Sequence, residues 1–389
     1  MKSNQGFWAV FVREWKRIIN SRACRFGLFV APLLSMIVLL WMMSSGLPEQ
    51  IPIAVIDHDN SATSRSLIRQ LDAFSKTNIA YQCDNFGEAR ELMEKSKIYA
   101  ILDIPADFAT DAVAGKQPKL VYYTNNSFLI SGSLLFQDLK TVSTLASAAV
   151  GLQVGEAKGY TADQLMPVLM PISIDAHPLS NPWLNYSLYL NNILIPGILQ
   201  LLIILFTISA FGSEVKSGNG QKLLELSGNS IFKTITGKAL PYTIILSVFS
   251  LLAISLLHFY SGFPMASGFW PTFLNYVCLM IGGQGMGLLV LAVFKNYSFS
   301  VSVGSLLGVI SFSISGFTFP AMAMDSWLTA LGYLFPLKYF FLNYVDQTLH
   351  GYPFGYSAIN YACMLAFMLA AYLSMGHIKY YLQRNKYTL

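Results

Sequence analysis

Five long stretches of the chain contain no Lys, Arg, Asp or Glu, and they set its basic plan. They cover residues 26–48, 176–213, 239–294, 296–324 and 351–378. A helix needs about 20 mainly apolar residues to cross a bilayer, so each stretch predicts one span, except the third, which is long enough for two. Ser261-Gly262-Phe263-Pro264 and Trp270-Pro271 divide that stretch. The pattern predicts six transmembrane helices, at 26–46, 184–211, 239–260, 271–294, 298–320 and 356–377.

The segment between the first two predicted spans is of a different kind. Residues 47–185 number 139, and 18% of them are charged, against 8% in the remaining 250. Short apolar runs alternate there with helical patterns, from IPIAVID at 51–57 to one long helix predicted over 127–159. This alternation predicts an α/β domain with a mixed or parallel sheet, large enough for its own core. We therefore expect a domain over 47–183, inserted between spans one and two.

The placement of charge predicts the topology. The N-terminal 25 residues, the loop between the second and third spans, the turn at Lys295 and the C-terminal tail carry a net charge of +11, and the opposite side carries −6. The positive-inside rule places both termini in the cytoplasm and the α/β domain outside. A cleaved signal peptide is the alternative for the first span, but the long basic region before it and the lack of a clear A-x-A site favour a retained anchor.

Residues 1–25 are expected to form a cytoplasmic elbow segment with an amphipathic helix over 7–20. At 100° per residue, one arc of this helix is apolar and the other is charged or polar. We expect the helix to lie in the membrane interface, and the alternative is that it packs on protein. The apolar arc holds Phe7, Trp8, Phe11, Val12, Trp15, Ile18 and Ile19, and the other holds Arg13, Glu14, Lys16, Arg17 and Asn20.

The sequence carries no energy source that we can identify. No predicted span contains an ionisable Asp, Glu, Lys or Arg, which argues against an ion-coupled transporter or pump. Gly237-Lys238 lacks the remainder of a phosphate-binding loop, and the outer domain has neither a G-x-S-x-G motif nor clustered metal ligands. We therefore expect no enzyme, no catalytic residues and no bound metal, and energy that comes from a partner.

Several motifs are distinctive as a set. They include IAVIDHDNSATSRSL at 53–67, AILDIPADF at 100–108, IPGI at 195–198, GKALPY at 237–242, SGFTFPAM at 315–322 and FPLKYF at 335–340. In this order and topology the chain resembles the ABC-2 type permeases, in the subgroup with a large outer domain after the first span.

The resemblance implies the membrane subunit of an ATP-driven exporter in the bacterial cytoplasmic (inner) membrane. ATP and Mg would be bound by a separate cytoplasmic ATPase, and a second permease subunit, identical or homologous, would complete the pathway. In Gram-negative members a periplasmic adaptor and an outer-membrane channel often join the pump. The expected substrate is a small amphiphilic, drug-like or lipid-like molecule, and the surroundings are lipid, with no nucleic acid. The alternative is a membrane-anchored scaffold whose outer domain recruits a partner without transport.

The loop over 212–238 is where the ATPase is expected to act. It resembles the family pattern E-x-E-x-G-T-x-E-x-L-L-x-T-P, with matches at Gly218, Leu223 and Leu224 and departures at Lys216, Asn219, Gln221 and Ser227. Asn219 can replace Thr as the N-cap of a helix starting at Gly220. We expect a coupling helix over 218–226 whose leucines enter a groove of the ATPase, and the alternative is a solvated loop. Its predicted residues are Glu214, Gly218, Asn219, Gln221, Leu223, Leu224 and Leu226.

Two further sets of residues are candidates for the transport path. Polar side chains on the second span would line it if they face a dimer interface: Asn191, Asn192, Gln200 and Thr207. The segment over 319–345 is too broken by proline to span, and amphipathic or re-entrant helices fit it best. The resemblance implies an outer gate there, and the alternative is an aromatic belt. The gate candidates are Phe319, Pro320, Trp327, Pro336 and Tyr339.

Overall fold

A computed structural model describes residues 6–44, 46–170, 181 and 185–383 of the chain. The chain folds as two compact units, which we call the membrane unit (1–44 with 179–389) and the α/β unit (45–178). The domain boundary expected at 183–184 lies outside the described residues, as do Arg384 and Lys386 of the basic tail.

Six helices in the described part of the membrane unit are long and apolar enough to cross a bilayer, which confirms the predicted number. The first comprises α2 (Arg22–Arg25), the π-helical turn η1 (Phe26–Val30) and α3 (Ala31–Met42). The others are α9 (Tyr186–Lys216), α11 (Ile231–Ile254) continuing into the π-helical η2 (Ser255–Tyr260), α12 (Phe269–Phe294), α13 (Tyr297–Ile314) and α16 (Phe354–Leu373).

Two of these helices are longer than predicted, and the difference matters for function. The predicted second and third spans ended where the first charged residues occur, but α9 continues to Lys216 and α11 already begins at Ile231. Glu214 and Lys238 therefore lie inside helices that also carry spans. No charged residue lies within the predicted spans 184–211 and 239–260, and Glu214 and Lys238, in the parts of the helices beyond those bounds, pair with each other.

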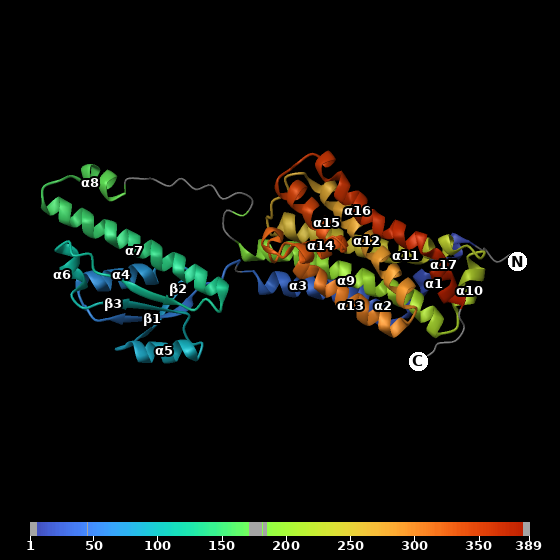
Figure 1. The fold of residues 1–389 in the computed structure, drawn as a ribbon, viewed down its shortest axis with the longest axis horizontal. Coiled ribbons are helices and arrows are strands. Elements are labelled where there is room, and N and C mark those ends of the chain that lie inside the picture. Colours follow the sequence, from blue (N-terminus) through green and yellow to red (C-terminus); the bar gives the residue numbers. More distant parts are fainter. Residues whose placement is uncertain (1–5, 45, 171–180, 182–184, 384–389) are drawn as a thin grey trace. The chain divides into compact units, whose positions relative to one another are not determined.

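Shorter helices complete the membrane unit, and α12 is its most buried span. Along α12 pack α9, α11 and α16, so that residues far apart in sequence form one apolar core (Figure 1). The shorter elements are α1 (Phe7–Asn20), α10 (Gly220–Leu226), the 3₁₀ turn η3 (Ala321–Ala323), α14 (Ser326–Gly332), α15 (Pro336–Asn343), the π-helical η4 (Tyr344–Leu349) and α17 (Met375–Gln383).

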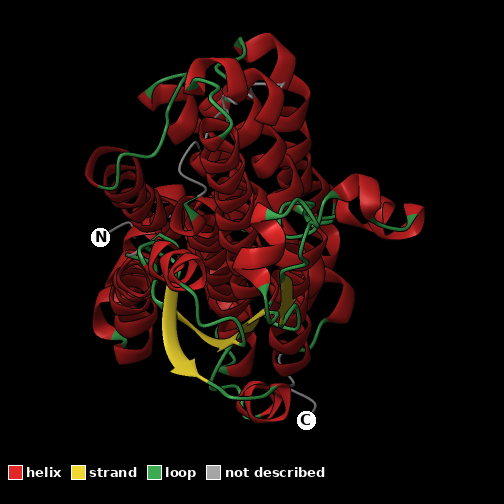
Figure 2. Ribbon diagram, turned by 90° about the vertical axis from the view of Figure 1, so that its left-hand side faces the viewer, coloured by secondary structure: helices red, strands yellow, loops and turns green. Residues whose placement is uncertain are grey.

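The α/β unit contains one four-stranded sheet, drawn as yellow arrows in Figure 2. Its order is β2-β1-β3-β4, built from β1 (Ile51–Asp57), β2 (Thr77–Gln82), β3 (Ala100–Ile104) and β4 (Val121–Thr124). The central strand β1 runs parallel to β2 and to β3, whereas β4 is antiparallel to β3. The sheet is therefore mixed, as the alternation of apolar runs and helical patterns predicted.

Helices cover both faces of this sheet (Figure 1). On one face α5 (Phe86–Glu94) covers the side chains of Ala54, Ile56 and Ile101. The other face packs against α4 (Ala62–Asp72), α6 (Phe108–Val113) and the long α7 (Leu129–Ala157), and α8 (Ala162–Leu169) leans on α7. Because strand residues alternate between faces, each face of β1 feeds a separate apolar core.

The contact between α12 and α16 gives a first prediction. A Cβ at Gly285 would lie 2.4 Å from the backbone nitrogen of Met368, so α12 and α16 can only meet there without a side chain. We expect Gly285→Ala to force the helices apart and to destabilise the protein by about 1–3 kcal/mol, measured as thermal unfolding in mild detergent. Gly355→Ala is the control, because a Cβ at Gly355 on α16 meets no atom within 4 Å. Equal unfolding temperatures for the two variants would contradict this packing.

Candidate functional site

The N-terminal helix α1 packs one narrow face against the rest of the chain. Its buried residues are Val10, Glu14 and Ile18, which share one face and pack against α11. The aromatic side chains of Phe7, Trp8, Phe11 and Trp15 stack along a more exposed face. The helix thus packs on protein through one charged and two apolar residues, whereas Trp8, Val12 and Ile19 of the predicted apolar arc are exposed.

The short helix α10 begins at Gly220, directly after Asn219. The Asn219 side chain does not cap it as expected, because its amide donates to Ser217 Oγ at 3.1 Å instead of accepting from the helix. Leu223 and Leu224 are only 1% exposed and belong to the apolar core of the membrane unit. The expectation that these leucines enter a groove on another protein is therefore wrong, since they already anchor α10 on its own chain.

The outward face of α10 is polar. Gln221, Lys222 and Glu225 are exposed on it, Gly218 precedes it in an exposed turn, and Leu226 is half-buried. Gly218 has a φ of +68°, which other residues rarely adopt. Any partner that docks here meets charged and amide groups rather than leucines.

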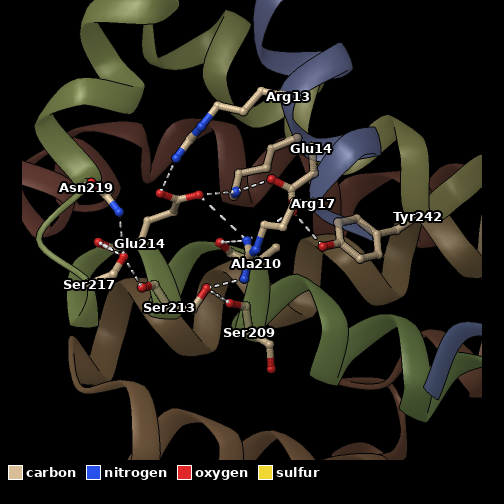
Figure 3. Close-up of polar contacts among 11 residues, drawn as sticks. Arg13, Glu14, Arg17, Ser209, Ala210, Ser213, Glu214, Ser217, Asn219 and Tyr242 are labelled. Atoms are coloured by element: carbon tan, nitrogen blue, oxygen red, sulfur yellow. Dashed lines mark hydrogen bonds and ion pairs between the residues drawn. The ribbon is translucent and has the colours of Figure 1, made fainter. Parts of the chain in front are cut away.

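Behind α10 lies a cluster of buried charges contributed by α1, α9 and α11, which we call the ion cluster: Arg13, Glu14, Arg17, Glu214 and Lys238. Figure 3 shows Arg13, Glu14 and Arg17 of α1 directed toward Glu214 of α9. Glu214 accepts from Arg13 Nη2 at 2.7 Å through Oε2 and from Lys238 Nζ at 2.9 Å through Oε1. Arg17 Nη1 lies 3.7 Å from the same Oε1.

The second carboxylate of the cluster, Glu14, joins α1 to α11. Its Oε1 accepts from Tyr242 Oη at 2.6 Å and from Arg17 Nη1 at 3.1 Å, and its Oε2 accepts from Lys238 Nζ. Arg17 also donates to the backbone oxygen of Ala210 at 3.0 Å and to Ser213 Oγ. Three helices from distant parts of the sequence are therefore tied at one point.

Burial raises the free-energy cost of breaking any of these ion pairs. Lys238, Glu14 and Glu214 are 0%, 1% and 3% exposed, whereas the side chains of Arg13 and Arg17 are 35% and 29% exposed. Burying an ion is costly unless it is paired and hydrogen-bonded, and here each carboxylate has at least two cationic partners. Burial alone would lower the pKa of Arg17, but the neighbouring carboxylates of Glu14 and Glu214 raise it, so Arg17 stays charged. Three cations face two carboxylates, and the excess charge is on the partly exposed arginines.

The ion cluster is also joined to α10 through the backbone. The amide of Asn219 donates to the carbonyl of Glu214 at 2.8 Å, and the amide of Gly6, before α1, donates to the carbonyl of Leu226 at 2.9 Å. At the start of α10, a Cβ on Gly220 would lie 2.2 Å from the carbonyl oxygen of Leu382 in α17, so α10 and α17 are in direct backbone contact. A displacement of α10 must therefore act on α1, α9 and α17.

The four polar candidates on α9 are all buried inside this chain. Asn191 donates to Ser187 Oγ at 2.9 Å, Asn192 to the Leu188 carbonyl at 2.7 Å, and Gln200 to Ser311 Oγ at 3.3 Å, while Thr207 donates to the Ile203 carbonyl at 2.7 Å. Within the described residues, the amide oxygens of Asn191, Asn192 and Gln200 have no partner. None of the four lies on an open surface of this chain, as lining an interface between subunits would require.

The gate candidates fall into two groups. Phe319, Pro320 and Trp327 are exposed, in and around η3 and α14. Pro336 is buried at the start of α15, and Tyr339 is half-buried with its hydroxyl donating to the Tyr333 carbonyl at 3.0 Å. The segment is helical in short pieces, as its prolines predicted, and its five candidates differ in exposure.

Glu14, Arg17, Lys238 and Tyr242 belong to the site although the sequence did not single them out. The available signals were a lone glutamate within a basic helix and a lysine at the border of an apolar stretch. Neither signal shows that the residues meet, because 224 positions separate Glu14 from Lys238. Among the residues described, no group of three or more His, Cys, Asp or Glu could hold a metal ion.

Comparison with known proteins gives two findings. A family model described as ABC-2 family transporter protein matches residues 24–375. The linearmycin resistance permease protein LnrN of Bacillus subtilis (strain 168) is 33% identical over 97 residues, a stretch that covers 24% of this chain and 24% of that protein.

The ion cluster gives a second prediction. Lys238→Met leaves Glu14 and Glu214 buried without their shared cation, and we expect it to destabilise the membrane unit by about 3–5 kcal/mol. Lys233→Met is the control, because Lys233 is exposed on the first turn of the same helix and should change stability by less than about 0.5 kcal/mol. Thermal unfolding of both variants in mild detergent measures the difference. Similar unfolding temperatures would show that Lys238 does not hold the cluster together.

Proposed function

The chain belongs to the ABC-2 family of transporter proteins, as a membrane permease subunit, and from this membership we propose that it exports a small amphiphilic molecule. The export is driven by ATP and Mg bound to separate ATPase chains. The name of LnrN attributes resistance to it, and resistance by a permease is consistent with outward transport. The family assignment supports a permease over a membrane-anchored scaffold without transport.

The observation that carries the proposal is the junction between α10 and the ion cluster. A partner bound to the exposed face of α10 cannot move that helix alone, because Leu223 and Leu224 are buried in the membrane core. The backbone bonds to Glu214 and Gly6 transmit the displacement to α9 and α1. The paired charges then hold α1, α9 and α11 together, so the displacement reaches the spans as one movement.

The proposed orientation follows from charge. Positive residues at the chain ends and in the α10 segment place these parts in the cytoplasm, where an ATPase is available, and place the α/β unit outside. A second permease, identical or homologous, provides the other half of the pathway, and a periplasmic adaptor with an outer-membrane channel completes the export route in a Gram-negative envelope. The α14–α15 segment remains the proposed outer gate, whereas the buried polar residues of α9 would line a substrate path only if a movement of the spans exposes them.

The burial of the leucines changes which substitution tests the coupling. Replacing Leu223 and Leu224 by Asp would place charges in the apolar core and unfold the region whether or not an ATPase binds. The exposed charges of α10 test docking without that effect, because neither side chain belongs to the core.

We therefore predict the effect of reversing the exposed charges. Lys222→Glu combined with Glu225→Lys should weaken co-purification of the ATPase by about tenfold, equivalent to about 1.4 kcal/mol, with unfolding temperature unchanged. Lys119→Glu, an exposed charge reversal in the α/β unit, is the control and should leave co-purification intact. The measurement is the amount of ATPase retained on the affinity-purified permease. Full retention by the double variant would contradict docking on this face.

A further inference from the structure

The α/β unit contains a cavity of about 700 Å³ that the proposed coupling does not use. It lies between α7 on one side and α6 with β4 on the other, and its apolar wall includes Phe108, Leu120, Ala146, Val150 and Val154. This volume is in the range of cavities that bind small ligands. The cavity is formed within one unit, so its existence does not depend on how the two units are arranged.

The sequence of α7 explains why packing leaves this space open. The residues of α7 that line the cavity are small or medium-sized and recur at helical spacing: Ser143, Ala146, Ser147, Val150, Gly151 and Val154. Farther along α7, Gly151 and Gly155 allow α8 to approach closely. A Cβ on Gly151 would lie 2.5 Å from the Leu169 side chain, and a Cβ on Gly155 would lie 2.4 Å from the Leu165 side chain. Helix α8 thus packs on α7, and its Leu169 forms part of the cavity wall. The space beside the two helices is the cavity.

The shape of the cavity is elongated along α7. Its lining on that helix extends from Ser143 to Val154, and at 1.5 Å per residue this is about 16 Å. Apart from a few polar side chains, among them Gln117, Ser143 and Ser147, the walls along this length are apolar, which suits an extended acyl chain better than a compact polar solute.

The charged residues that line this cavity and the one beside it are basic. Residues 47–185 contain 15 acidic and 10 basic residues, yet no Asp or Glu lines this cavity or the adjoining one of about 350 Å³. Lys158 lines the larger cavity and Lys140 the adjoining one, and both are exposed. Within the described part of the chain neither lysine forms an ion pair, so both ammonium groups are available to an anion.

We infer that this cavity binds a single-chain anionic amphiphile, with its acyl chain along α7 and its acidic head group at Lys158. The pairing of apolar walls with an unpaired cation at the rim matches both parts of such a molecule. Binding of this kind goes beyond the proposed coupling to an ATPase and does not require it, because every residue involved belongs to the α/β unit.

The test uses the full chain in nanodiscs of phosphatidylcholine and a palmitic acid that carries a diazirine and an alkyne. After irradiation and digestion, we expect labelled peptides from residues 108–122 and 143–154. Ser147→Trp fills the cavity and should lower this labelling by about tenfold. This is the loss of affinity expected when about two methylenes of the acyl chain can no longer be buried. Thr141→Trp is the matched control, since Thr141 is exposed on the same helix and lines neither cavity.

A second arm tests the head group. Lys158→Glu, at the exposed rim, should lower labelling by the acid but should not lower labelling by the alcohol of the same chain length. Lys140→Glu should lower labelling by the acid less than Lys158→Glu does. A phosphatidylcholine with the photoreactive group on one chain should label the cavity less than the free acid. Equal labelling in Ser147→Trp and Thr141→Trp would overturn the site. Equal loss of the acid and the alcohol in Lys158→Glu, or stronger labelling by the phospholipid, would overturn the ligand class.

Discussion

The membrane unit depends on a buried cation held between two carboxylates. Lys238 has no exposed surface, and its ammonium group meets Glu14 of α1 and Glu214 of α9. Each of the three groups would be costly at this depth alone, so the helices that carry them gain stability only when all three are assembled. The position of α1 against α9 and α11 follows from this requirement more than from its aromatic face.

The proposed coupling requires a helix of seven residues to act on long spans, and its packing fits that role. A segment as short as α10 is not stable alone, and its stability comes from the leucines that it buries. Those leucines fix it to the membrane core, and two backbone hydrogen bonds tie its ends to the residues next to the ion cluster. The polar outer face then remains free for recognition, whereas the inner face transmits movement. In the proposed coupling, docking and force transmission are thus divided between opposite faces of one helix.

Much of the architecture could be predicted from the sequence because it depends on local patterns. The stretches free of charge located the six spans, and the alternation after the first span indicated a mixed or parallel sheet, whose strand β1 matches IPIAVID at 51–57. The start of α10 at Gly220 also agreed with the prediction, although the Asn219 side chain does not cap the helix. The burial of Leu223 and Leu224 could not be predicted, because an apolar residue in a loop is equally consistent with a partner's groove and with the chain's own core. The pairing of Glu14 with Lys238 depends on tertiary contact, which no local pattern records. Glu214 and Lys238, which border the uncharged stretches used to predict the second and third spans, are the residues whose ion pair joins α9 to α11.

Hydrogen exchange provides the most direct test of the claim that the ion cluster transmits movement from α10. The permease would be reconstituted with its ATPase, and exchange compared with and without trapped ATP, in the wild type and in a variant with Glu14→Gln, Glu214→Gln and Lys238→Met. This variant removes the buried charges together, and Arg13 and Arg17 can reach solvent. In the wild type, ATP should change exchange in α10, in α1 and at the adjoining ends of α9 and α11. In the variant, the change should persist in α10 and in the parts of α1 and α9 that its backbone hydrogen bonds reach, but it should no longer appear in α11. The same ATP-dependent change in α11 of both proteins would contradict the account.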